Sequence, residues 1–162
     1  RQKHGLVLEF SVAENLILQN YMKEPYSKKG VLKKDAIMAH AKDLVERFDI
    51  RPAGSESRPA GTLSGGNQQK VVLAKLIAHD DIQIYIFDEP TRGIDVGAKS
   101  DIYRLISDFV KIGIPSIVIS SEIPEIQARC DRVVIMSEGR VTAILNRDQL
   151  KDSNEILKYA IS

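Results

Sequence analysis

The chain has 162 residues, with 23 lysines and arginines against 22 aspartates and glutamates, and a net charge of +1. This balance argues against a protein that binds nucleic acid through bulk charge, and 43% hydrophobic residues suffice for a packed core. The single cysteine, Cys130, excludes an internal disulfide framework and fits a reducing compartment. No apolar run approaches the ~20 residues of a membrane span, and the start is too charged for a secretory signal. Composition therefore predicts a soluble intracellular protein of mixed structure.

The first part of the chain carries helical patterns. Ser11 and Glu14 have the spacing of a capping box, and apolar residues recur at helical spacing over 37–48. Between them, the segment YMKEPYSKKG indicates a basic, exposed loop that ends at Gly30. Two prolines and two glycines then cluster in 51–62, which predicts a division of the chain near residue 60.

The second part alternates between strand and helix patterns. In chain order we expect a helix after the glycines at 65 and 66, a strand over 82–88, an amphipathic helix over 102–110 capped by Gly113, a strand over 116–120, two short strands joined by a Glu138-Gly139 turn, and a helix over 154–161. This order predicts an α/β fold with a parallel unit and an antiparallel hairpin. Two parallel strands are too few to stand alone, so the rest of the sheet is missing from this pattern.

The segment LSGGNQQK, Leu63 to Lys70, places a hydroxyl and two glycines where a helix begins. A helix N-terminus offers unpaired N–H groups and a partial positive charge, and glycines let a phosphate approach the backbone. An ordinary serine-capped helix with a glycine turn explains the same residues.

Carboxylates follow the first of the two strands. Asp88 and Glu89 end an apolar run, at the edge where α/β sheets bind ligands. The first could hold Mg²⁺ and the second could orient or deprotonate water, although a solvated strand end is an equal alternative. Asp95 reads as a helix N-cap, and Ser120, Ser121 and Glu122 end the second strand.

Together, in this order, the motifs resemble the carboxyl part of an ABC transporter ATPase domain. LSGGNQQK matches the ABC signature, IQIYIFDEP the Walker B strand, TRGIDVGAK the D-loop, SSEIPE the switch region, and GLVLEFSVAENL the entry to the helical subdomain. The second ATPase half of simple-sugar importers is the most similar. The resemblance implies a partial P-loop NTPase fold, with a helical subdomain over 1–60 and the carboxyl half of the core sheet, with its antiparallel hairpin, over 61–162.

In this family two halves close head to tail around ATP, so the signature acts on nucleotide held by the partner half. The resemblance assigns that role to the following residues: Leu63, Ser64, Gly65, Gly66 and Gln68. It also implies that Asp88 supports Mg²⁺, Glu89 polarises the attacking water, and Asp95 lies at the interface between the halves.

The chain departs from the family pattern at two places. It has no G-x-x-x-x-G-K-[ST] loop, which the family carries upstream, so we expect a piece of a longer protein that is inactive alone. The family histidine at the switch position is Ser121 here, and the three histidines (His4, His40, His79) lie elsewhere. A serine lacks the charge and reach of an imidazole, which predicts a weakened site around Glu89.

The implied partners are a second ATPase half (upstream in the same polypeptide or a second copy), membrane permease subunits and, indirectly, a sugar-binding protein, at the cytoplasmic face of the cell membrane. No nucleic-acid partner is expected. A nucleoside importer is the alternative within the family. A chromosome-maintenance or repair ATPase is another, disfavoured because residues 1–60 lack sustained heptads. A third is an interaction domain that has lost the reaction, against which Glu89 argues.

Overall fold

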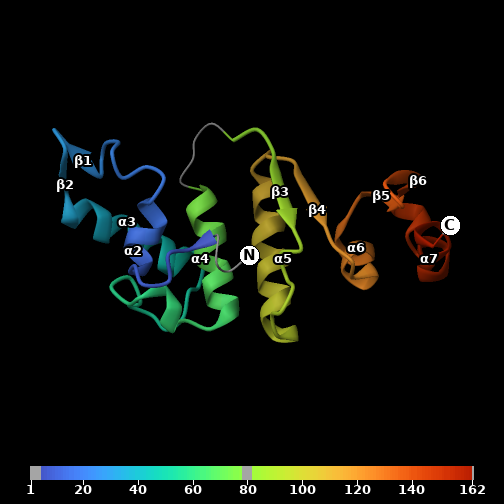
Figure 1. Ribbon diagram of the computed structural model, residues 1–162, viewed down its shortest axis with the longest axis horizontal. Coiled ribbons are helices and arrows are strands. Elements are labelled where there is room, and N and C mark those ends of the chain that lie inside the picture. The colour runs from blue at the N-terminus through green and yellow to red at the C-terminus, as the bar shows by residue number, and fades with distance from the viewer. Residues whose placement is uncertain (1–4, 78–81, 162) are drawn as a thin grey trace. The chain divides into compact units, whose positions relative to one another are not determined.

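The computed structural model describes residues 5–77 and 82–161 (Figure 1). In chain order the elements are α2 (Val12–Ile17), β1 (Ser27–Lys28), β2 (Val31–Leu32), α3 (Lys34–Arg47), the 3-10 helix η1 (Ala60–Thr62), α4 (Gly65–Ile77), β3 (Tyr85–Asp88), α5 (Val96–Lys111), β4 (Ser116–Ile119), α6 (Ile123–Arg129), β5 (Arg132–Ser137), β6 (Arg140–Asn146), η2 (Arg147–Gln149) and α7 (Ser153–Ala160). They form two compact units. The first holds the described residues up to Tyr85 together with Thr91–Ser116, and the second holds Ile86–Pro90 and the described residues from Ile117 onward.

Helix α2 begins with the predicted capping box. The Ser11 hydroxyl accepts the N–H of Glu14 at 3.2 Å, and the Glu14 carboxylate accepts the N–H of Ser11 at 2.8 Å. Helix α3 turns the apolar face expected from its spacing toward the core, where Ile37, Ala41 and Leu44 are buried. The capping box and this helix are therefore confirmed.

Asn15, on α2, is fully buried and holds the turn that leads into the helix. Its side chain accepts the N–H of Val7 at 2.8 Å and donates to the carbonyls of Val7, Phe10 and Ser11 at 2.9–3.3 Å. Buried backbone groups must find such partners, because leaving them unpaired costs free energy. One amide therefore satisfies a turn that has no regular secondary structure of its own.

Asn15→Ala should lower the free energy of unfolding by about 2–3 kcal/mol, because it leaves unpaired the partly buried backbone groups that the amide now pairs. Chemical denaturation followed by circular dichroism measures the change. Asn154→Ala, at an exposed position in the first turn of α7, should stay within about 0.5 kcal/mol of the parent. Equal losses in the two variants would contradict this role of Asn15.

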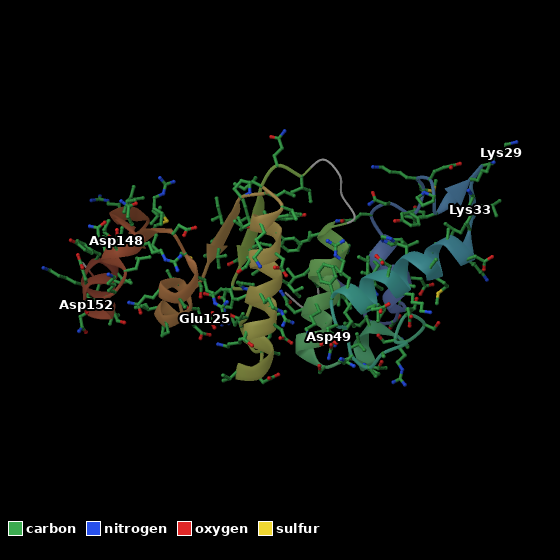
Figure 2. All side chains as sticks on the ribbon, turned by 180° about the vertical axis from the view of Figure 1, so that it is seen from behind. Lys29, Lys33, Asp49, Glu125, Asp148 and Asp152 are labelled. Atoms are coloured by element: carbon green, nitrogen blue, oxygen red, sulfur yellow. The ribbon has the colours of Figure 1, made fainter. Side chains whose placement is uncertain are left out.

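The loop expected before Gly30 contains a small hairpin, so this prediction was wrong for part of its length. Strands β1 and β2 pair antiparallel, with Ser27 opposite Leu32, and Lys29 marks the tip (Figure 2). Both turn residues, Lys29 and Gly30, have positive φ (52° and 78°), as a two-residue hairpin turn with the right twist requires. Each strand is only two residues long, which is too short to show the alternation of apolar and polar residues that marks a strand in a sequence.

Helices α4 and α5 pack side by side within the first unit (Figure 1). The inner face of α5 is buried, and its Phe109 packs against the Tyr85 ring with centroids 4.7 Å apart. Ile112 caps α5, and Gly113 follows with φ of 91°, a left-handed conformation that favours glycine. The amphipathic helix is confirmed, with its C-cap one residue earlier than expected.

Strands β3 and β4 form a two-stranded sheet. The N–H of Tyr85 donates to the carbonyl of Pro115 at 3.0 Å, and the N–H of Glu89 to that of Ile119 at 2.8 Å. From the first of these bonds to the second, the donor and the acceptor both move forward along the chain by the same number of residues. The strands therefore run parallel, as predicted. Strand β3 begins at Tyr85, three residues later than the apolar run suggested.

Strands β5 and β6 form the predicted antiparallel hairpin of the second unit, closed by Glu138 and Gly139 with φ of 49° and 77°. One face of the hairpin packs against α7, and the buried core of this unit consists of Val133, Ile135, Leu145, Leu150 and Ile156. Cys130 lies half-buried against this core, and burial raises the pKa of its thiol.

The sequence patterns did not predict α6. This helix carries Pro124 in its first turn, where the missing N–H of proline costs no hydrogen bond.

Within residues 5–77 and 82–161, no helix combines the length and the apolar character that crossing a membrane demands.

Candidate functional site

The segment resembling the ABC signature lies at the start of α4. Ser64 is exposed and caps the helix, because its hydroxyl accepts the backbone N–H of Asn67 at 3.4 Å. The same hydroxyl accepts the side-chain amide of Asn67 at 2.9 Å, and the Ser64 carbonyl accepts the N–H of Gln68 at 2.9 Å. The structure therefore bears out the serine-capped reading. The cap leaves the start of the helix facing solvent, which also suits an anionic ligand.

The Gln68 side chain holds the turn at the start of α4 in place. Its side-chain amide donates to the carbonyl of Leu63 at 2.9 Å, and the Leu63 side chain is buried. Gln68 therefore positions the backbone of the signature, whereas the resemblance expected it near a phosphate. Asn67, which the sequence reasoning did not single out, accepts the backbone N–H of Arg51 at 2.7 Å. This bond ties the signature to the turn after α3, and no local pattern could have revealed it.

Gly66 has a packing role. A Cβ atom built on Gly66 would lie 2.8 Å from the Cβ of Ala98 and 3.7 Å from the side chain of Ile94. Helices α4 and α5 can approach this closely only because residue 66 has no side chain. The second glycine of the signature is therefore required by the fold, whether or not a phosphate approaches it.

Asp95 is the N-cap of α5, as predicted. Its carboxylate accepts the N–H of Ala98 at 3.0 Å, and the side chain lies at an exposed position. Ala98 is also the residue against which Gly66 packs. The start of α4 and the N-terminal turn of α5 thus meet within the first unit.

Asp88 and Glu89 belong to the second unit, at the carboxyl end of β3. Asp88 is the last, exposed residue of the strand. Glu89 has φ of 49°, a left-handed conformation that costs a non-glycine residue free energy and occurs often at functional sites. Its carboxylate accepts the backbone N–H of Ser121 at 3.0 Å. The structure therefore brings Glu89 together with Ser121, the residue that the resemblance places at the switch position of the same site.

Ser121 reaches Glu89 through its main chain, so this contact does not depend on the identity of its side chain. The neighbouring Ser120 hydroxyl accepts the N–H of Glu122 at 3.1 Å, a local hydrogen bond typical of a polar strand end. The Ser121 side chain itself is exposed.

Two separate features of the chain suit a magnesium nucleotide, the Asp88 carboxylate in the second unit and the start of α4 in the first. Mg²⁺ in phosphoryl-transfer sites is bound by one or two carboxylates, with phosphate oxygens and water as further ligands, and Asp88 offers an exposed carboxylate at a strand end. The open helix start at Ser64 and Gly65 suits phosphate oxygens. Among the described residues, no group of three or more His, Cys, Asp or Glu side chains could hold a metal ion.

Of the three histidines, only His40 falls within the described residues. It is half-buried on α3 and packs against the Tyr26 ring, with centroids 5.2 Å apart. Burial lowers the pKa of its imidazole, although the charge of Asp43 opposes the shift. His4 and His79 lie outside the described residues.

Solved structures define the class of fold. The chain superimposes on cbiO1 from Clostridium perfringens, part of the ABC transporter complex cbiONQ, with a TM-score of 0.72 and 24% identity over 97% of this chain and 59% of that one. It also matches MJ1267, an ATP-binding cassette of an ABC transporter, with a TM-score of 0.74 and 20% identity over 98% of this chain and 68% of that one. The fold is that of ABC ATPase cassettes in part, which confirms the predicted fold class.

Sequence comparisons identify the family. The profile of the ABC transporter family matches residues 1–92, more than half of the chain. The ribose import ATP-binding protein RbsA of Hahella chejuensis is 43% identical over 99% of this chain, and that of Lactococcus lactis is 41% identical over 95%. The chain spans about 30% of the length of these curated relatives. The chain belongs to the ABC transporter family, as its motifs indicated.

Proposed function

We propose that this chain forms part of the ATPase of an ABC importer and couples ATP hydrolysis to the uptake of a simple sugar. The observation that carries the ATPase assignment is the Glu89 carboxylate, held at the end of β3 by the N–H of Ser121. The relatives support the transported class, because proteins named for ribose import are 41–43% identical to this chain over nearly its whole length. A nucleoside importer is the alternative.

Each residue has a separate task in this proposal. ATP with Mg²⁺ supplies the phosphoryl group that is transferred to water. The start of α4, with Ser64, Gly65 and Gly66, offers N–H groups to the γ-phosphate of nucleotide held by a partner half. Leu63 and Gln68 keep that backbone in place through the hydrogen bond between them.

The carboxylates act in the site of this half. Asp88 supports Mg²⁺, and Glu89 orients and polarises the attacking water. The bond from the Ser121 N–H fixes the Glu89 carboxylate, so catalysis here rests on positioning and electrostatics. Asp95 lies at the interface between the halves, while its carboxylate caps α5.

The proposed assembly follows from the same family. Residues 1–60 form the helical subdomain and residues 61–162 the carboxyl part of the core. The phosphate loop comes from elsewhere in a longer polypeptide, so this chain alone does not hydrolyse ATP. A partner ATPase half, membrane permease subunits and a sugar-binding protein complete the importer at the cytoplasmic face of the cell membrane.

Two measurements test this function. The complete ATPase, produced with its permease and binding protein in cells that lack their own ribose importer, should restore uptake of labelled ribose. Uridine uptake without ribose uptake would instead identify a nucleoside importer. The isolated chain should melt cooperatively and show no saturable binding of fluorescent ATP with Mg²⁺. Tight binding that Asp88→Ala abolishes would contradict the proposed half-site.

A further inference from the structure

Lys70 is a buried lysine on α4, six positions after Ser64. Its side chain is only 6% exposed, and its ammonium group lies 3.0 Å from the Asp101 carboxylate and 3.1 Å from the Asp49 carbonyl. The Asp49 carboxylate is 3.7 Å away. Asp49, labelled in Figure 2, follows the end of α3, and Asp101 lies on α5. A single buried cation therefore joins three segments of the first unit.

The Lys70–Asp101 ion pair lies one helical turn beyond the contact between Gly66 and Ala98. Lys70 follows Gly66 by four residues on α4, and Asp101 follows Ala98 by three on α5, so each pair lies along one face of its helix. The Gly66–Ala98 contact sets how closely the helices approach at their first turns. One turn further, the Lys70–Asp101 bond sets their register.

The environment of Asp101 favours the charged pair. The hydrogen bond from Lys70 lowers the pKa of the Asp101 carboxyl, and the charges of Lys70 and Arg104 act in the same direction against the effect of burial. Arg104, 3.4 Å away, holds the other carboxylate oxygen. Desolvation of the buried Lys70 ammonium offsets much of its attraction to Asp101, whose side chain is 34% exposed, but removing the carboxylate would leave a costly unpaired charge. Such a pair is suited to fixing the position of α4 relative to α5.

We propose that Lys70 is a positioning residue that holds the signature at the start of α4 in fixed register with Asp95 at the start of α5. This role rests on the proposed ATPase function. In this proposal the start of α4 and Asp95, the N-cap of α5, form a single rigid element that faces the partner half. Asp49 extends the element to the end of α3.

In the complete ATPase, Lys70→Met should lower kcat for ATP hydrolysis by about 10- to 100-fold per folded molecule, because small misplacements of positioning groups carry such costs. Lys70→Arg, which keeps the charge, should stay within about threefold of the parent. Lys75→Met is the matched control on the same helix, since the Lys75 ammonium donates only weakly, at 3.4 Å, to the Gly5 carbonyl. Equal kcat in Lys70→Met and the parent, or equal losses in the Met and Arg variants, would overturn the proposal.

A second readout does not depend on hydrolysis. Spin labels at Thr62→Cys, at the end of η1 just before α4, and at Val96→Cys, the first residue of α5, report the distance between these two helix entries in a Cys130→Ala background. Lys70→Met should broaden the distance distribution, whereas Lys70→Arg and Lys75→Met should leave it narrow. A narrow distribution in Lys70→Met would refute the positioning role. Broadening without hydrolysis by the parent ATPase would support the positioning role and count against the proposed function.

Discussion

Glu89→Gln in the complete ATPase should lower ATP turnover only a few-fold, whereas the matching substitution in the partner half should lower it about 100-fold or more. The expectation follows from the proposed function, in which the two composite sites are unequal. In that proposal the LSGG segment of this chain completes the site of the partner half, whereas Ser121 stands where the family carries a histidine in the site that contains Glu89. Only the main chain of Ser121 reaches the Glu89 carboxylate. Steady-state phosphate release measures both variants.

Two further substitutions sharpen this test. Ser121→His should raise turnover at the Glu89 site, because the Glu89 contact uses the backbone and survives the change. Glu138→Gln is the matched control, since Glu138 is exposed and has the same φ of 49° as Glu89 but lies on the hairpin turn. It should leave turnover unchanged. A greater loss from Glu89→Gln than from the matching change in the partner half would refute the inequality of the sites.

Gly66→Ala should destabilise the chain and weaken the signature together. The added Cβ would lie 2.8 Å from that of Ala98, so α4 and α5 must separate. Overpacking of this kind costs about 1–3 kcal/mol, and each kcal/mol lowers the Tm of a chain of this size by about 2–4 °C. Thermal melts of the isolated chain measure the loss, and hydrolysis by the complete ATPase should fall with it.

Gly97→Ala is the control for Gly66→Ala, because Gly97 also lies in the first turn of a helix but a Cβ there meets only the Asp95 carboxylate, at 3.3 Å. Its Tm should not fall by a comparable amount. Ala98→Gly should restore most of the stability lost in Gly66→Ala, since it removes the opposing methyl group. A Tm for Gly66→Ala equal to that of the parent would show that the helices can separate at no cost.

Local chemistry allowed much of this protein to be predicted from its sequence. The capping box of Ser11 and Glu14, the Asp95 cap and the Glu138-Gly139 turn involve residues at most three positions apart, so each pattern is visible in the chain itself. The ordered motifs indicated the ABC ATPase fold for the same reason, because each is a contiguous segment. The β1–β2 hairpin escaped prediction because two-residue strands carry no readable period.

The tertiary structure alone decided which distant residues meet. In the fold, the Asp101 carboxylate accepts a hydrogen bond from Lys70, thirty-one residues away in the chain. The Ser121 N–H likewise donates to the Glu89 carboxylate, thirty-two residues away. The fold also shows that Gly66 is required by the approach of α4 to α5, a reason that LSGG alone does not reveal. Sequence periodicity shows which face of a helix is apolar, but the neighbour of that face follows only from packing the whole unit. For this protein, the sequence by itself determined the helix caps, the turns and the family motifs, and packing decided how the motif residues are held.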